Sequence, residues 1–69
     1  MDDLTNRFTY HPPIKNQQER YVALRSAALE LARMIEDLTP KSREQALALT
    51  NLEQSIFWAN AAIARNEKE

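Results

Sequence analysis

Hydrophobic residues recur at alternating intervals of three and four along two long stretches of the chain. In the first stretch they are Tyr21, Leu24, Ala28, Leu31, Ile35 and Leu38. In the second they are Leu49, Leu52, Ile56, Ala59 and Ile63. This spacing is typical of a heptad seam between helices that pack nearly parallel or antiparallel. It predicts helices at about residues 17–38 and 43–66, within a hairpin over residues 17–66.

Residues that favour helix ends stand at the borders of both stretches. Asn16 precedes the first, and Glu19 three positions later completes a capping-box pattern. Pro40 favours an end to the first helix, while Ser42 and Gln45 form a second capping-box pattern. A link of about four residues makes the helices antiparallel neighbours. The expected fold class is all-α, an antiparallel two-helix hairpin.

The segment before the first helix has a different composition. Residues 8–10 favour extended backbone, and Pro12 and Pro13 extend the segment further. We therefore expect residues 1–16 to form an extended N-terminal arm. At the other end of the chain, residues 67–69 read as a frayed polar tail.

The second helix has more apolar surface than one seam covers. The residues outside the seam are Leu47, Phe57, Trp58, Ala61 and Ala62. A chain of 69 residues is too short to bury such a surface alone, and small folds usually need a disulfide, a metal or a partner. The sequence has no cysteine and one histidine, which excludes disulfides and a multi-histidine metal site. Self-association remains, so we expect a compact homo-oligomer.

The charge and composition exclude several classes of function. A net charge of −1 argues against a general binder of DNA or long RNA, so a bound anion must be small and held by local basic groups. The chain has no glycine and hence no glycine-rich phosphate loop. No apolar run reaches the roughly 20 residues that span a bilayer, and the N-terminus lacks a signal-peptide layout. The default is a soluble cytoplasmic protein without a membrane partner.

Aromatic and basic residues are grouped in the segment 7–13. Its aromatic rings are suited to stacking on bases, and arginine or histidine to meeting phosphate, although Phe8 and Tyr10 also have a simpler reading as anchors of the arm. Arg25 likewise has two readings, as a phosphate ligand or as part of a solvated helix face. His11 has no evident nucleophile beside it, and we expect no catalytic residue and no metal site.

Four segments together resemble one known family. They are RFTYHPP at residues 7–13, ERY at 19–21 followed by Leu24 and Arg25, SREQALALT at 42–50, and WANAAIARN at 58–66. In this order they resemble the phage anti-CBASS protein 2 family, which is related to a Thoeris anti-defence sponge. The resemblance runs from about Arg7 to Glu67. Any one of these segments alone would be a weak signal.

The resemblance implies a function that the spacing of residues does not show. Members of that family look like helical hairpins assembled into a compact homohexamer. They sequester cyclic dinucleotides and cyclic trinucleotides, such as cGAMP and cyclic tri-adenylate, without cleaving them. Effectors of CBASS defence then stay inactive. By this resemblance the chain is not an enzyme, needs no cofactor, and acts in the cytoplasm of an infected bacterium.

The resemblance also implies site residues. The base-stacking tyrosine of the dinucleotide pocket corresponds to Tyr10, and its phosphate-binding basic residue to Arg25, where some relatives are expected to have lysine. Phe8 and His11 are expected in the wall of the same pocket. The trinucleotide pocket, at a threefold meeting of subunits, is expected to use Arg65, Asn60 and Asn66. Apart from any family, Asn60 lies among apolar neighbours and should bond across an interface.

Two other functions fit the same residues. One is an oligomeric protein-interaction module that docks a host protein through Phe57 and Trp58. The other is a phosphodiesterase that destroys the signal. Among cyclic nucleotides, preference depends on hydrogen bonds to base edges, which a helical pattern does not contain.

Overall fold

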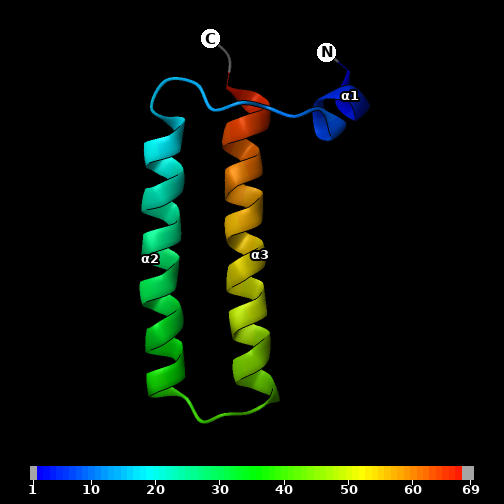
Figure 1. Cartoon of the computed structure of the whole chain (residues 1–69). Coiled ribbons are helices and arrows are strands. Elements are labelled where there is room, and N and C mark those ends of the chain that lie inside the picture. Colours follow the sequence, from blue (N-terminus) through cyan, green and yellow to red (C-terminus); the bar gives the residue numbers. More distant parts are fainter. Residues whose placement is uncertain (1, 68–69) are drawn as a thin grey trace.

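The computed structural model describes residues 2–67, and that range contains three helices and no strand (Figure 1). Helix α1 spans Asp3–Phe8, α2 spans Gln17–Leu38 and α3 spans Arg43–Asn66. The bounds of α2 and α3 agree with the two helices that the sequence predicts. The two lie side by side and run antiparallel, and α1 lies beside the C-terminal end of α3. Within the described range, no helix combines the length and apolar character that a bilayer crossing requires.

The link between α2 and α3 forms largely as predicted. Thr39 leaves the helix with φ −126° and ψ 149°, the extended conformation that the following proline favours. The Ser42 hydroxyl accepts a hydrogen bond from the backbone N–H of Gln45 at 3.1 Å, so Ser42 caps α3. The Gln45 side chain does not return to Ser42. Its Nε2 donates instead to the backbone oxygen of Thr39 at 3.0 Å, which fastens the link to the first turn of α3.

The start of α2 differs from the predicted capping box. The Asn16 side chain makes no capping hydrogen bond, so that prediction is wrong. The Gln17 side chain instead holds the segment before the helix, since its Oε1 accepts from the backbone N–H of Ile14 at 3.0 Å. Its Nε2 donates to the backbone oxygen of Ile63 at 3.3 Å and to Oε1 of Glu67 at 3.0 Å. Gln17 therefore joins the start of α2 to the end of α3.

The prediction of an extended arm over residues 1–16 is wrong for its first half. Asp3–Phe8 form α1, because the Asp2 carboxylate caps the helix by accepting from the backbone N–H of Thr5 at 2.8 Å. Thr9 then returns to extended backbone, with φ −107° and ψ 139°. Lys15 has a φ of 50°, the left-handed conformation that glycine would adopt more easily, at the turn into α2. Residue 1 lies outside the described residues.

The polar tail predicted at residues 67–69 also needs correction. Glu67 is the C-cap residue of α3, and its carboxylate bonds both Gln17 and Arg20. It is therefore part of the joint between the helices and is not frayed. Residues 68 and 69 lie outside the described residues.

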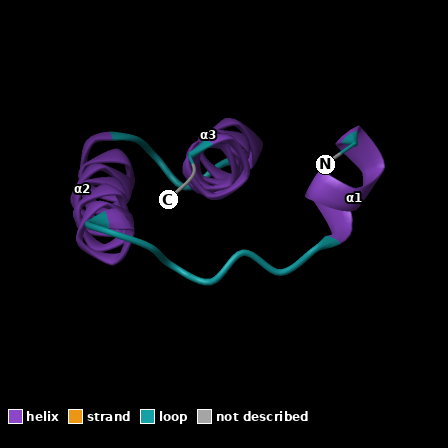
Figure 2. Ribbon diagram, turned by 90° about the horizontal axis from the view of Figure 1, so that it is seen from above, coloured by secondary structure: helices purple, strands orange, loops and turns teal. Residues whose placement is uncertain are grey.

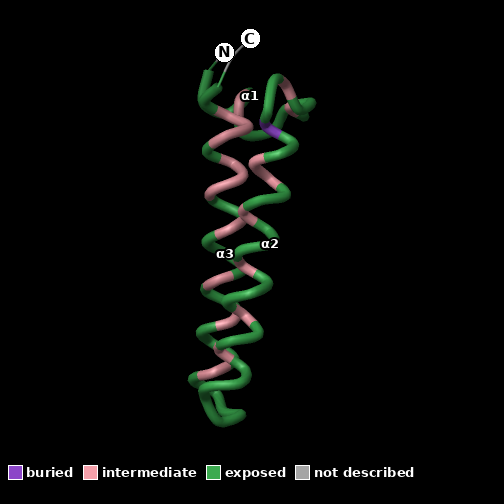
Figure 3. The backbone as a smooth tube through the Cα atoms, turned by 90° about the vertical axis from the view of Figure 1, so that its left-hand side faces the viewer, coloured by how far each residue is buried: buried purple, intermediate pink, exposed green. Residues whose placement is uncertain are grey.

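The seam between α2 and α3 is narrow. Along α3 the predicted positions Leu49, Leu52, Ile56, Ala59 and Ile63 are half-buried. Along α2, Ala32 is half-buried, whereas the predicted seam residues Leu31 and Leu38 are exposed. The half-buried residues of α2 therefore follow one another about one helical turn apart, on a single face of the helix. Figure 3 shows half-buried positions recurring along the length of both helices.

The hairpin encloses no hydrophobic core. Among the described residues no apolar side chain is fully buried, and Gln17, 2% exposed, is the only buried residue. The radius of gyration is 15.0 Å, whereas a compact chain of this length has one of about 11 Å. The single chain is therefore elongated, and polar hydrogen bonds at the helix ends hold segments together that no buried core joins.

The Ser42 cap provides a test of these helix ends. We expect Ser42→Ala to lower the free energy of unfolding by about 1 kcal/mol, since one orphan N–H of α3 loses its acceptor. Urea denaturation followed by circular dichroism, at one fixed protein concentration, measures the change. Ser55→Ala, at an exposed position inside α3, is the matched control and should cost nothing because alanine favours helix. Equal destabilisation by both variants would contradict the cap.

Candidate ligand-binding site

A hollow of about 400 Å³ lies where the segment after α1 passes the first turns of α2 and the last turns of α3. Figure 2 shows this segment running from α1 past one side of α3 to the start of α2. We call this hollow the arginine pocket. Its lining residues are Arg7, Thr9, Tyr10, His11, Tyr21, Arg25, Asn60, Ala61, Ala64 and Arg65. All three helices and the connecting segment thus contribute to it.

The arginine pocket is locally positive although the chain is not. Three arginines line it, and no aspartate or glutamate does. Arg7 pairs with the exposed carboxylate of Asp3 at 3.7 Å and lies 5.7 Å from the centre of the Phe8 ring. The guanidinium groups of Arg25 and Arg65 have no ion-pair partner within residues 2–67. Two unpaired guanidinium groups beside tyrosine rings favour a ligand that carries both negative charge and flat rings.

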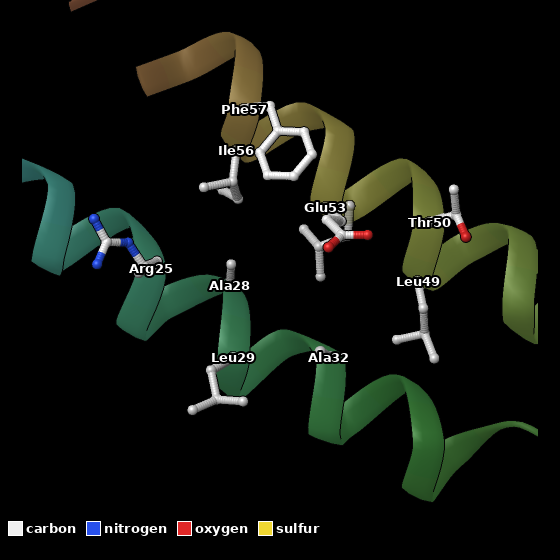
Figure 4. A pocket seen from close by; sticks show the side chains of 10 residues that line it. Arg25, Ala28, Leu29, Ala32, Leu49, Thr50, Glu53, Ile56 and Phe57 are labelled. Atoms are coloured by element: carbon white, nitrogen blue, oxygen red, sulfur yellow. The ribbon is translucent and has the colours of Figure 1, made fainter. Parts of the chain in front are cut away.

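A second hollow, the hairpin groove, has a different character. It holds about 490 Å³ between the middle parts of α2 and α3, and most of its lining is aliphatic or aromatic. Figure 4 shows Arg25 at one end of this groove, with Glu53 of α3 further along it. One cation offset by one carboxylate gives no comparable preference for anions. We therefore place the candidate site in the arginine pocket.

Arg20, the other basic residue of the first turns of α2, does not line the arginine pocket and pairs with Glu67 instead. Its two guanidinium NH₂ groups bond both carboxylate oxygens of Glu67, one of them at 2.7 Å. The hydrogen bond from Arg20, followed by the one from Gln17, lowers the pKa of Glu67 from its ordinary 4.5 to about 2. The same bond to Glu67 raises the pKa of Arg20. Arg20 therefore serves the joint between the helices, whereas Arg25 is left for a ligand.

Asn6 holds the connecting segment in place beside α3. Its Nδ2 donates to the backbone oxygen of Arg65 at 3.1 Å, which docks α1 against the end of α3. Its own backbone oxygen accepts from Nε2 of His11 at 2.8 Å. Because a carbonyl oxygen only accepts, Nε2 carries the ring proton in this arrangement. These two bonds fix His11, and the backbone of the adjacent Tyr10, at the rim of the arginine pocket.

Comparison with known families agrees with this architecture. A family model described as "Acb2/Tad1, hairpin domain" matches residues 1–64. The chain belongs to the Acb2/Tad1 hairpin family. This is the anti-CBASS protein 2 family that the sequence segments resemble. No curated protein and no solved structure shows a significant match to the chain.

Membership of the Acb2/Tad1 family gives the hairpin a broad role. It supports a phage anti-defence sponge, a protein that binds a signal rather than converting it. An arginine-lined, carboxylate-free pocket is consistent with binding an anionic signal.

The structure brings most of the expected site residues together. Tyr10, His11, Arg25, Asn60 and Arg65 all line the arginine pocket. The family resemblance implies two separate pockets for these residues, one for dinucleotides and one for trinucleotides. Within one chain they share a single hollow.

Phe8 and Asn66 lie outside that lining. Phe8 is 80% exposed at the end of α1, and its ring lies beside Arg7. The Asn66 side chain donates to the backbone oxygen of Ala62 at 3.0 Å, which occupies its amide within α3. Their assignment to ligand pockets stays a prediction.

Sequence reasoning missed the residues that position the site. Asn6, Gln17 and Glu67 were not assigned any role in it, because their partners lie 46 to 59 residues away along the chain. The heptad spacing places Tyr21 in the seam, and Tyr21 also lines the arginine pocket. For Gln17, one local signal was present, a long amide at the first position of a helix. For Asn6 the sequence has no comparable signal.

The Glu67 joint predicts a dependence of stability on pH. Because the folded pKa of Glu67 is depressed, its contribution is fully present above the ordinary value of 4.5 and is lost as the pH falls through about 2. We expect Glu67→Gln to unfold more easily than the parent chain at pH 7, with the difference fading towards pH 2. Urea midpoints across this pH range measure it.

Glu30→Gln is the matched control for this experiment. Glu30 is exposed on α2 and forms no ion pair with any residue in the range 2–67. This variant should follow the parent chain at every pH. A constant difference between Glu67→Gln and the parent from pH 7 to pH 2 would show that the charge of Glu67 does not stabilise the fold.

Proposed function

We propose that this chain sequesters cyclic dinucleotide and cyclic trinucleotide second messengers, such as cGAMP and cyclic tri-adenylate, and releases them intact. Depletion of these signals keeps CBASS effectors inactive in the cytoplasm of the infected bacterium. The observation that carries the proposal is the arginine pocket, where three arginines and two tyrosines meet without a carboxylate in the lining. Membership of the Acb2/Tad1 family supports the same role.

Each part of such a ligand has a matching group in the pocket. A cyclic dinucleotide carries two phosphates and two base faces. The Tyr10 side chain belongs to a residue that is 80% exposed, so its ring is accessible for stacking on a base. The unpaired guanidinium of Arg25 is suited to a phosphate, which it meets with a planar fork of donors. Arg65, on the opposite helix, offers a second group of the same kind.

A homohexamer would multiply these groups. The single chain leaves Phe57 61% and Trp58 68% exposed, and apolar surface of this kind favours self-association. Around a twofold axis, two copies supply one Tyr10 and one Arg25 to each half of a cyclic dinucleotide. Around a threefold axis, Arg65, Asn60 and Asn66 from three copies suit a cyclic trinucleotide.

Ligand binding is tested by calorimetric titration with cGAMP and with cyclic tri-adenylate. Stacking on an aromatic ring contributes about 1–3 kcal/mol per base, so we expect Tyr10→Ala to weaken cGAMP binding roughly 5- to 150-fold. Tyr10→Phe keeps the ring and should bind nearly as well as the parent. Arg25→Ala should also lose affinity, whereas Arg33→Ala, exposed on α2 outside the pocket, should not.

Chromatography of the ligand released by heating separates a sponge from a phosphodiesterase. Intact cGAMP supports sequestration, and a linear product would contradict it. If neither ligand produced heat on titration into the parent chain, the proposed function would be withdrawn.

The proposed assembly has its own test. Light scattering in solution should give a mass of six chains of 8.0 kDa, and Trp58→Ser should reduce it. A monomer at micromolar concentration would contradict the hexamer. With Phe57 and Trp58 then exposed in solution, that result would favour the second candidate function, a module that docks a host protein through this face.

A further inference from the structure

Asn6 is the only residue of α1 whose surface is partly covered, since the other residues of Asp3–Phe8 are exposed. The apolar side chains of this helix do not attach it to the hairpin, because Leu4 is 63% and Phe8 80% exposed. Figure 2 shows α1 beside the end of α3, on the side away from α2. The position of α1 on the hairpin therefore depends on the polar contact that Asn6 makes.

The acceptor in that contact is a backbone oxygen for which α3 has no partner of its own. Helix α3 ends at Asn66, and the last four carbonyl oxygens of a helix have no partner within it. Arg65 carries one of them, and Nδ2 of Asn6 donates to it at 3.1 Å. Because the bond uses the backbone, the Arg65 side chain stays in the lining of the arginine pocket. Asn6 thus fixes α1 to a residue of the pocket without occupying its guanidinium group.

Asn6 also holds the segment that follows α1. Its backbone oxygen accepts from Nε2 of His11 at 2.8 Å, and this bond closes residues 6–11 into a loop. Tyr10 lies within the loop and is 80% exposed, so packing of its own ring does not fix its position. The two bonds of Asn6 therefore determine where Tyr10 stands relative to α3.

We infer that Asn6 is a positioning residue, which raises the affinity of the arginine pocket by holding Tyr10 where a base stacks on it. The inference rests on the proposed function and adds a residue that is not itself among the lining residues of the pocket. A segment that is ordered only when the ligand binds lowers the affinity by the free energy of its ordering. Asn6 orders the segment beforehand, so the stacking contact retains more of its strength.

The test begins with calorimetric titration of Asn6→Ala with cGAMP. We expect binding to weaken about 2- to 12-fold, the range that corresponds to the net contribution of one hydrogen bond. Asn51→Ala is the matched control, because Asn51 is exposed on α3 outside the pocket. This control should bind cGAMP as the parent does.

Stability is measured on the same variants, so that positioning is separated from loss of folding. The joint between α2 and α3 is made by Gln17, Arg20 and Glu67, so Asn6→Ala should keep the parental urea midpoint and mass in solution. Ser42→Ala provides the opposite case, since it removes a helix cap at the far end of the hairpin. It should unfold more easily and still bind cGAMP with parental affinity.

A double-mutant cycle shows whether Asn6 acts through Tyr10. In a chain that already carries Tyr10→Ala there is no ring to position, so adding Asn6→Ala should weaken binding less than 2-fold further. A residue that merely supports the fold would weaken binding by the same factor in both backgrounds, because the two effects would then add.

Weaker binding by Asn6→Ala at parental stability, together with its disappearance in the Tyr10→Ala background, supports the inference. Parental affinity of Asn6→Ala, additive effects in the cycle, or an equal loss of affinity in Ser42→Ala overturns it and leaves the sponge function intact. A parent chain that binds neither cGAMP nor cyclic tri-adenylate overturns the proposed function and this inference together.

Discussion

Two helices packed side by side leave no enclosed interior, and this constraint shapes the rest of the molecule. Only one narrow stripe of each helix is shielded, so no described apolar side chain is fully buried. The open end of the hairpin is held instead by a polar joint, in which Gln17 reaches Ile14, Ile63 and Glu67 at once. Such bonds each contribute modestly, yet they join segments that no core would hold together.

The same joint divides the basic residues between structure and ligand. The Glu67 carboxylate at the end of α3 accepts hydrogen bonds from both NH₂ groups of Arg20. Asn6 donates to the backbone oxygen of Arg65, and the guanidinium group of Arg65 stays unpaired within the described residues. One carboxylate at the C-cap therefore decides which arginine is neutralised. Because Arg25 lies further along α2, it stays outside this pair and lines the pocket. A chain of net charge −1 thereby keeps a local positive site.

Local sequence patterns predicted α2, α3 and their link correctly, because heptad spacing and the Ser42 cap each depend on residues that are close together in the sequence. They failed at α1, where Asp2 caps a short helix against the extended preference of the aromatic residues that follow. The heptad spacing also placed Leu31 in the seam, whereas in the structure Leu31 is exposed and the neighbouring Ala32 is half-buried. The residues that line the site were identified through family segments. The bonds that position them, such as Asn6 to Arg65, join distant residues and leave no local trace.

The composition of the arginine pocket sets how widely a sponge of this kind binds. Phosphate contacts and aromatic stacking are nearly indifferent to the identity of a base, so Arg25 and Tyr10 alone would accept many cyclic nucleotides. Selectivity among bases then depends on a polar group that meets a base edge, in addition to the groups that provide affinity.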